Sequence, residues 1–133
     1  PKLPFHVHDS VVLGQLIAAR AAAAASDGDG GGGVLDLGSG SGLPSVVVAS
    51  VNPALPVYAV ESKSRKTRFL ARCRDALSLP LYTPLTQNVH ELSASWVFDV
   101  AVVTAKAFKP LPEVAPIARR CVLRGATLHV PIS

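Results

Sequence analysis

The sequence predicts an α/β fold with a doubly wound, mostly parallel sheet. Short valine-rich segments alternate along the chain with segments of helical spacing, the order typical of parallel strands joined by helices. A turn with alternating glycines follows the first of these strands, and an acidic residue ends the second. In open α/β sheets such positions meet at the carboxyl ends of neighbouring strands, where nucleotide-like ligands bind.

Hydrophobic periodicity places the elements in order. Asp9 and Ser10 can cap a first helix, which runs into an alanine-rich stretch that favours helix. A glycine tract then ends this helix and is expected to act as a slack tether into the first strand. The expected helices cover residues 11–25, 45–51, 65–77 and 111–120. The expected strands cover residues 34–37, 57–60, 81–85, 97–103 and 126–130.

Two prolines and one helix face refine these elements. Pro84 cannot donate a ladder hydrogen bond, so the strand at 81–85 is expected at an edge of the sheet. Pro116 is expected to disrupt the helix at 111–120. In the helix at 65–77, apolar residues at helical spacing predict the buried face. These residues are Phe69, Leu70, Cys73, Ala76 and Leu77.

The length and composition suit one small domain. The chain has 133 residues, of which 49% are hydrophobic, enough for a single core. We expect an N-terminal helix with a glycine-rich tether over residues 1–33, followed by one core over residues 34–133. The chain contains no methionine and opens with Pro1, so it is expected to be a piece of a longer protein.

Charge and residue usage limit the classes of partner. No apolar run reaches the length of a membrane span, so no membrane partner is expected. Cys73 and Cys121 lack the spacing of a metal site and the histidines are scattered, so no metal is expected. The formal net charge is +4, and basic residues concentrate between Lys63 and Arg74, which favours a polyanionic partner.

The turn after the first strand is the strongest indication of a ligand. Glycine takes positive φ freely and allows close approach to a ligand. The dinucleotide-binding motif is G-x-G-x-x-G. Counted from Gly38, its last glycine would fall at position 43, which is Leu43 here. The turn suits S-adenosylmethionine (SAM), which has a cationic sulfonium and an amino-acid end in place of a pyrophosphate. A tight turn that binds nothing is the structural alternative. The turn comprises Asp36, Gly38, Ser39, Gly40 and Gly42.

Glu61 ends the second expected strand. An acid at this position can accept hydrogen bonds from both hydroxyls of a ribose. NAD and SAM both contain that ribose, so Glu61 indicates an adenosine group without choosing between the two cofactors. The alternative is a solvated carboxylate that faces Lys63 or Arg65 at the strand end.

Four segments in order extend this interpretation, namely His6–Val12, Asp36–Pro44, Glu61–Leu70 and Thr104–Leu111. Together they resemble the bacterial-type small-subunit (16S) ribosomal RNA guanine-N7 methyltransferases, also called glucose-inhibited division protein B or RsmG. The third segment is similar to the family's Asp-Ser-x-x-Lys-Arg-x-x-Phe-Leu pattern, and the fourth to its Thr-Ala-Arg-Ala-x-x-Pro-Leu pattern. The resemblance extends from Phe5 to Val130.

The resemblance implies a Rossmann-like SAM-dependent methyltransferase fold with S-adenosyl-L-methionine as cofactor. Glu61 would hold the ribose, and Asp36 would lie near the methionine end. Lys106 would face the target base as the catalytic residue. The other residues implied at the cofactor are Gly38, Ser39, Gly40, Gly42, Asn88, Val89 and His90. The residues implied at the RNA are Lys63, Arg65, Lys66, Arg68 and Lys106.

Two of these RNA assignments have structural alternatives. Lys106 can equally be a surface lysine whose stem packs beside Phe108. The basic helix can be an ordinary solvated face. The chain also departs from the family's pattern, because Asn88 replaces an arginine, His90 an acid, and Pro131 a lysine.

Two functions therefore remain open. The first is SAM-dependent methyl transfer to guanine N7 of small-subunit ribosomal RNA. The second is a catalytically degenerate factor that binds this RNA, the ribosomal small subunit or its assembly intermediates. A nucleotide-dependent oxidoreductase is a third hypothesis, and Leu43 argues against it.

The alanine and glycine tracts bear on location. They are unlike a compact bacterial enzyme and suggest a GC-rich eukaryotic gene, so an organellar homologue in the mitochondrial matrix is expected. The alternative location is the cytoplasm.

Overall fold

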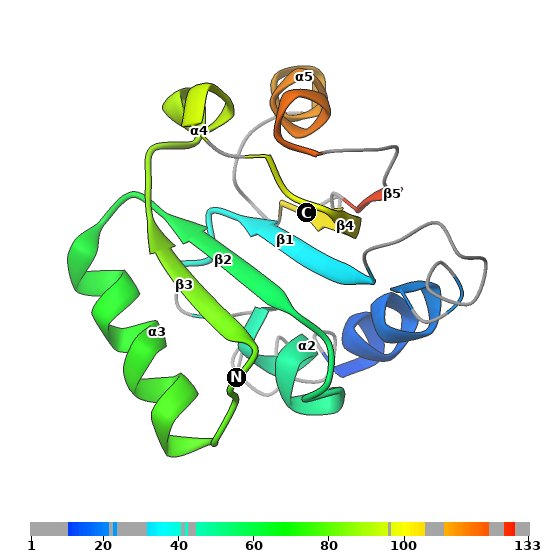
Figure 1. Cartoon of the computed structure of the whole chain (residues 1–133), viewed down its shortest axis with the longest axis vertical. Coiled ribbons are helices and arrows are strands. Elements are labelled where there is room, and N and C mark those ends of the chain that lie inside the picture. The colour runs from blue at the N-terminus through cyan, green and yellow to red at the C-terminus, as the bar shows by residue number, and fades with distance from the viewer. Residues whose placement is uncertain are drawn as a thin grey trace, which may run out of the picture.

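The computed structural model describes residues 11–21, 23, 32–40, 42, 45–95, 97–105, 111–122 and 127–129. Within them, strands form one parallel sheet with helices on both faces (Figure 1). The strands are β1 (Gly33–Leu37), β2 (Val57–Glu61), β3 (Tyr82–Thr86), β4 (Val100–Thr104) and β5 (Thr127–His129). The labelled helices are α2 (Ser45–Val51), α3 (Ser64–Ala76), α4 (Val89–Ser95) and α5 (Leu111–Cys121). A further helix covers residues 11–21.

The order of the strands creates a switch point at the centre of the sheet. The order is β3-β2-β1-β4-β5, and every pairing is parallel. The chain runs outward from β1 to one edge and then crosses back to β4, so the connections after β1 and β4 leave in opposite directions. Ligands of open α/β sheets bind outside the carboxyl ends of the strands at such a point. The predicted doubly wound parallel fold is confirmed.

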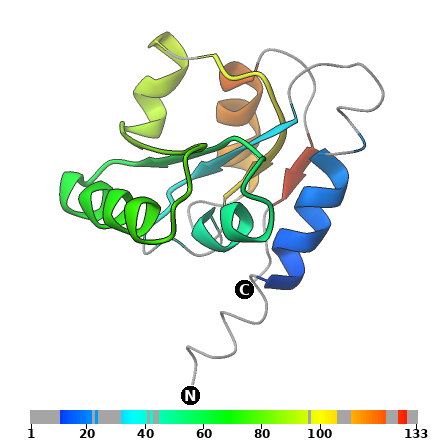
Figure 2. The ribbon, with the colours of Figure 1, turned by 60° about the horizontal axis from the view of Figure 1, so that its bottom comes forward.

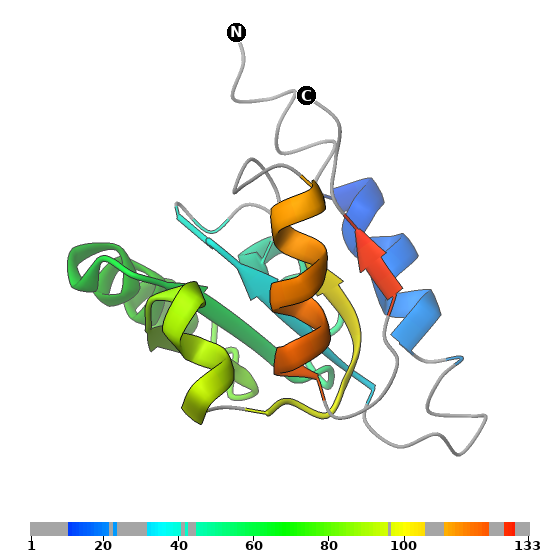
Figure 3. The ribbon, with the colours of Figure 1, turned by 90° about the horizontal axis from the view of Figure 1, so that it is seen from above.

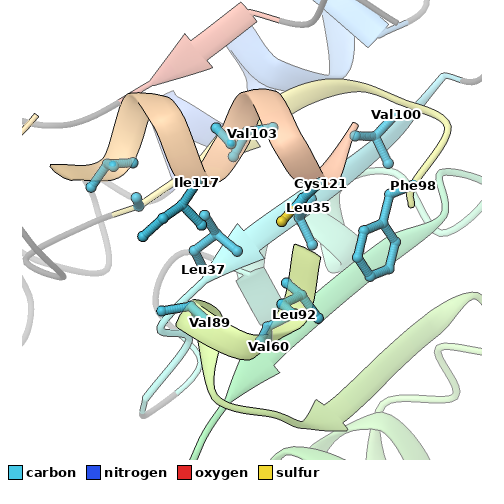
Figure 4. Packing of buried hydrophobic residues seen from close by; sticks show 13 residues of the cluster. Leu35, Leu37, Val60, Val89, Leu92, Phe98, Val100, Val103, Ile117 and Cys121 are labelled. Carbon is cyan, nitrogen blue, oxygen red and sulfur yellow. The ribbon is translucent and has the colours of Figure 1, made fainter. Parts of the chain in front are cut away.

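The helices form two layers. The helix over residues 11–21, α2 and α3 cover one face of the sheet, and α4 and α5 cover the other (Figures 2 and 3). Successive β1 residues point to opposite faces, so Val34 packs in the first layer and Leu35 in the second. Figure 4 shows Leu35 and Leu37 beside Cys121 and Ile117 of α5. Asp36 alternates with its neighbours and shares the face of Val34.

The N-terminal helix belongs to the same core as the sheet. Ile17 and Ala21 are fully buried in the cluster that contains Val34. Gly14 lies against α2, where an added Cβ would be in ordinary van der Waals contact, 3.4 Å from the Cα of Val48. This contact fixes the helix directly beside the connection that follows β1.

The structure corrects the predicted start of the fourth strand. β4 begins at Val100 rather than at residue 97, and Phe98 forms only an isolated bridge with Val122. Gly33 pairs with Val100 but Val34 pairs with Val102, so β4 accommodates an additional residue as a bulge. The bulge brings Thr104 level with Asp36.

One helix was not predicted, and the disruption expected at Pro116 of the predicted helix at 111–120 is absent. α4 was not expected, yet Asn88 begins it by accepting a hydrogen bond from the His90 backbone N–H at 2.9 Å. Asn88 followed by Glu91 is a capping pattern, and it is the sequence feature that identifies this helix. Pro116 does not end α5, which continues to Cys121. Pro116 is exposed, so the hydrogen bond it omits lies on the solvent side of the helix.

The predicted buried face of α3 is also largely wrong. Of its apolar residues only Leu70 is buried, while Phe69 is 42% and Leu77 53% exposed. α3 lies over β2 and the edge strand β3, so only a narrow stripe of it touches the sheet. Thr67 completes that stripe with a 2.6 Å hydroxyl contact to Thr86. The edge position predicted for the Pro84 strand is confirmed.

None of the helices in the described ranges is long and apolar enough to cross a bilayer. The same ranges contain no group of histidine, cysteine and acidic side chains arranged to hold a metal ion.

Candidate functional site: the glycine turn and its two acids

The glycine turn joins the end of β1 to α2 and is tied to β2. Gly38, Gly40 and Gly42 all have positive φ, at 74°, 55° and 92°. The backbone N–H groups of Gly38 and Ser39 donate to the Val60 carbonyl at 2.8 and 3.0 Å. The turn therefore keeps its shape through bonds to the neighbouring strand.

Two of these glycines are needed for different reasons. A Cβ on Gly42 would lie 2.8 Å from Cγ2 of Val46 and 3.2 Å from Cδ2 of Leu70, so this glycine permits close packing. Within the described part of the chain, a Cβ on Gly40 would meet only the Gly38 carbonyl oxygen, at 3.9 Å. No described atom therefore crowds the backbone of Gly40, and a ligand can lie against it.

Asp36 lies buried beneath the turn, with 1% of its surface exposed. The Thr104 hydroxyl donates to Oδ1 at 2.6 Å, and the Ser39 hydroxyl donates to Oδ2 at 2.8 Å. This carboxylate thus joins the end of β1, the turn and the end of β4. Thr104 was not assigned to the site from the sequence, although it is a polar residue ending a valine-rich strand, as Asp36 is.

Glu61 lies against the turn at the end of β2. Its Oε1 accepts the backbone N–H of Gly40 at 3.2 Å, and its Oε2 accepts that of Lys63 at 2.9 Å. The residue is only 7% exposed. The alternative of a solvated carboxylate facing a basic side chain is therefore wrong, because backbone amides hold Glu61 in place.

The segment after β3 reaches the same edge. The Gln87 N–H donates to the Glu61 carbonyl at 3.1 Å, which holds this segment beside β2. Asn88 and His90 are exposed, whereas Val89 is 7% exposed and packs in the core under α4. The Asn88 carboxamide oxygen is used as a helix cap. Of the three residues expected beside the adenine, Val89 is therefore the one that also packs in the hydrophobic core.

The basic residues of α3 begin with Lys63, two residues after Glu61 at the carboxyl end of β2. Lys63, Arg65, Lys66 and Arg68 are all exposed, and none of them forms an ion pair with another part of the chain that the structure describes. The first turn of α3 has no acidic residue, and Lys63 provides no side-chain cap. Cations at a helix N-terminus oppose the helix dipole, so they weaken the helix rather than stabilise it. Lys106, Ser41 and Leu43 lie outside the described residues.

A pocket elsewhere in the structure is separate from this site. An open pocket of about 660 Å³ lies at the far end of α3, between Arg74, Ser78 and Thr83. It shares no residue with the glycine turn or its acids.

Together, the sheet order and the turn define the class of the protein as a Rossmann-like SAM-dependent methyltransferase fold. The solved structure of a SAM-dependent methyltransferase from Thiobacillus denitrificans, in complex with S-adenosyl-L-homocysteine, matches with a TM-score of 0.59 and 17% identity, over 73% of this chain and 40% of that one. Coclaurine N-methyltransferase matches with a TM-score of 0.63 and 17% identity, over 74% of this chain and 30% of that one. At these identities the likeness concerns the fold alone.

The family model for rRNA small subunit methyltransferase G (GidB) matches residues 3–130, so the chain belongs to this family. The ribosomal RNA small subunit methyltransferase G of Halorhodospira halophila is 32% identical over 86% of this chain and 47% of its own length. That of Thermobifida fusca is 38% identical over 71% of this chain and 39% of its own length. The chain thus spans less than half of these curated relatives.

Proposed function

We propose that the protein transfers the methyl group of SAM to N7 of a guanine in small-subunit ribosomal RNA. The observation that supports this best is the 3.2 Å hydrogen bond from the backbone N–H of Gly40, in the turn after β1, to Oε1 of Glu61 at the end of β2. It joins Glu61, the proposed acceptor for the ribose, to the backbone of Gly40, against which the cofactor would lie. Family membership supports the RNA substrate.

The residues present fit the cofactor. Glu61 would accept the ribose hydroxyls with the acceptor capacity left by its two amide contacts and by the Ser62 hydroxyl, which donates to Oε2 at 3.4 Å, since a carboxylate has about four acceptor sites. The backbone of Gly38 and Gly40 would lie against the cofactor, and Asp36 would act near its methionine end. The segment at Val89 would flank the adenine. When bound, the cofactor supplies a methyl group activated by the positive sulfonium.

This chemistry asks little of the protein's own side chains. Guanine N7 already has a lone pair, so its attack on a methyl group needs no general base. The protein has to hold two reacting atoms in line and exclude water, and such positioning alone can account for a large part of a rate enhancement. Lys106, which follows Thr104 by two residues, is proposed to face the target base.

Basic side chains of α3 that form no ion pair within the described ranges support RNA binding by this helix. Arg65, Lys66 and Arg68 are exposed on a helix whose N-terminus lies at the cofactor edge, where Lys63 begins it. Because their position opposes the helix dipole, they are better explained by a ligand than by helix stability. Phosphates of an RNA strand provide the complementary charge.

The alternative, a binding factor without catalysis, is supported by one segment in which the sequence differs from the family's pattern. Asn88 and His90 stand where the family has an arginine and an acid, and Asn88 serves as a helix cap. A pocket altered beside the adenine would favour a protein that binds small-subunit RNA, or assembly intermediates of the subunit, without transferring a methyl group.

One experiment separates the two functions. Full-length protein is incubated with tritiated SAM and either small-subunit RNA or immature subunits, with the Glu61→Ala variant as control. Label at a guanine N7 that is lost in the variant supports the enzyme. Cofactor and RNA binding without label supports the assembly factor. Failure to bind the RNA would contradict both functions, whereas RNA binding without SAM binding would contradict the enzyme alone.

We also propose a mitochondrial location, with the cytoplasm as the alternative. The support is the low-complexity alanine and glycine composition between residues 18 and 33. Fluorescent tagging of the full-length protein tests it, and exclusion of the signal from mitochondria would contradict it.

A further inference from the structure

We propose that Thr104 is a positioning residue of the methyl-donor site and acts through Asp36. The inference rests on the proposed function and adds a residue from a third element, β4. Its hydroxyl lies 2.6 Å from Oδ1 of Asp36, and both residues are 1% exposed. Ser39 of the turn donates to the other carboxylate oxygen at 2.8 Å and is 2% exposed.

The geometry fixes which atom donates. A carboxylate in this arrangement accepts from both hydroxyls, and the 2.6 Å contact of Thr104 has the length of a charge-assisted hydrogen bond. With one donor on each oxygen, the Asp36 carboxylate cannot rotate about its Cβ–Cγ bond without breaking both bonds.

The direction of the carboxylate matters for a particular part of the cofactor. The hydroxyls of Ser39 and Thr104 are neutral, so they orient the Asp36 carboxylate without adding a charge of their own. An oriented anion beneath the turn is complementary to an ammonium group, which SAM has at its amino-acid end. The adenosine end would instead be held by Glu61, which accepts the Gly40 N–H of the same turn. Loss of Thr104 should therefore affect one end of the ligand and spare the other.

The same bond couples two parts of the site. Thr104 ends β4 at the register position paired with Asp36, and it precedes Lys106 in the chain. A hydroxyl held on Asp36 thus ties the strand leading to Lys106 to the turn that borders the cofactor. The bulge in β4 is what brings the two residues level.

The test uses two ligands that differ at one end. S-adenosylhomocysteine has the adenosine and the amino-acid end, whereas 5′-methylthioadenosine lacks the amino-acid end. Thr104→Val removes the hydroxyl with little change of shape. We expect it to lower the affinity for S-adenosylhomocysteine, measured by calorimetry, by about tenfold. Affinity for 5′-methylthioadenosine should stay within about twofold of the parent. Thr104→Ser should restore the parent's affinities.

Two further variants keep the test decisive. Ser39→Ala removes the second hydroxyl bond and should show the same selective loss if Thr104→Val does not fold. Ser50→Ala is the control, because the Ser50 hydroxyl donates to the Val46 carbonyl within α2 at 2.8 Å and makes no described contact with Asp36. It should leave the ratio of the two affinities unchanged.

The outcomes also separate this inference from the proposed function. Equal weakening of both ligands by Thr104→Val, or no weakening, would overturn the positioning role while the cofactor pocket stands. A parent protein that binds neither ligand would overturn the cofactor pocket itself, and the role of Thr104 with it.

Discussion

The carboxylate of Glu61 accepts the backbone N–H of Gly40 at 3.2 Å, which joins the end of β2 to the turn after β1. The bond holds the carboxylate in place before any ligand arrives, because Lys63 N–H occupies its second oxygen at 2.9 Å. A preformed acceptor loses less conformational entropy on binding than a mobile one.

Glu61→Ala should weaken the binding of S-adenosylhomocysteine by about 1–3 kcal/mol, because the ribose hydroxyls would be left without an acceptor. Calorimetry on the parent and variant measures this directly. Glu61→Gln, which retains one carbonyl acceptor, should lose less. An affinity unchanged in Glu61→Ala would remove this residue from the cofactor site.

The two acids and the turn could be predicted because they depend on local patterns. Strand periodicity places Asp36 and Glu61 at the ends of strands, and parallel strands bring those ends together. The partner of Asp36 could not be predicted in the same way. Thr104 is separated from it by 68 residues, and a bulge in β4 sets their register.

The helix α4 and the exposed face of α3 were not predicted, and each has a physical cause. α4 begins where Asn88 caps the backbone N–H of His90, but a seven-residue helix offers too short a window for periodicity. Phe69 of α3 follows a helical apolar pattern and is nevertheless 42% exposed. Periodicity reports a candidate face, whereas the edge position of β3 decides how much of that face meets the sheet.

Gly42→Ala and Gly40→Ala should separate packing from ligand contact. At Gly42, positive φ combines with a Cβ 2.8 Å from Val46, so alanine should cost about 1–3 kcal/mol of unfolding free energy. At Gly40 no described atom crowds the backbone, and alanine should cost only about 1 kcal/mol. S-adenosylhomocysteine affinity should fall for Gly40→Ala because its new methyl group would enter the ligand space.

Urea unfolding and calorimetry on both glycine variants check this contrast. Gly40→Ala binding as tightly as the parent would show that the ligand does not lie against this backbone. A Gly42→Ala variant as stable as the parent would contradict the packing argument.

The cations of α3 should affect RNA affinity and helix stability in opposite directions. Arg65→Ala should reduce the slope of log K against log salt by about 0.7–0.9 for a small-subunit RNA fragment, if Arg65 contacts one phosphate. The same change should stabilise the protein by about 0.3–1 kcal/mol, because it relieves repulsion with the helix dipole. Fluorescence anisotropy at several salt concentrations and urea unfolding provide the two measurements.

Arg119→Ala is the control for that prediction. Arg119 is exposed in the last turn of α5, in the layer on the opposite face of the sheet, where a cation favours the dipole. Its loss should leave the salt slope unchanged and slightly lower stability. Equal salt slopes for the parent, Arg65→Ala and Arg119→Ala would argue that α3 is only a solvated face.

Alkaline pH should destabilise the protein through two buried groups. Burial raises the pKa of Tyr82 above its ordinary value of 10.0, partly offset by its hydrogen bond to Ser45. Burial likewise raises the pKa of the Cys121 thiol above 9.0, with Arg120 opposing. The unfolded chain releases these protons at the ordinary values while the folded chain retains them. Stability is therefore full below pH 9.0 and falls as the pH rises past 9.0 and then 10.0.

Two variants at one hydrogen bond isolate the tyrosine in this alkaline loss. Tyr82→Phe and Ser45→Ala both remove the 2.8 Å hydroxyl pair, and each should cost about 1–3 kcal/mol at pH 7 because a buried hydroxyl loses its partner. Only Tyr82→Phe also removes the ionisable group, so its unfolding free energy should fall less steeply above pH 10.0 than that of Ser45→Ala. Urea unfolding between pH 7 and pH 11 measures both slopes, and identical slopes in the two variants would show that Tyr82 retains no proton on folding.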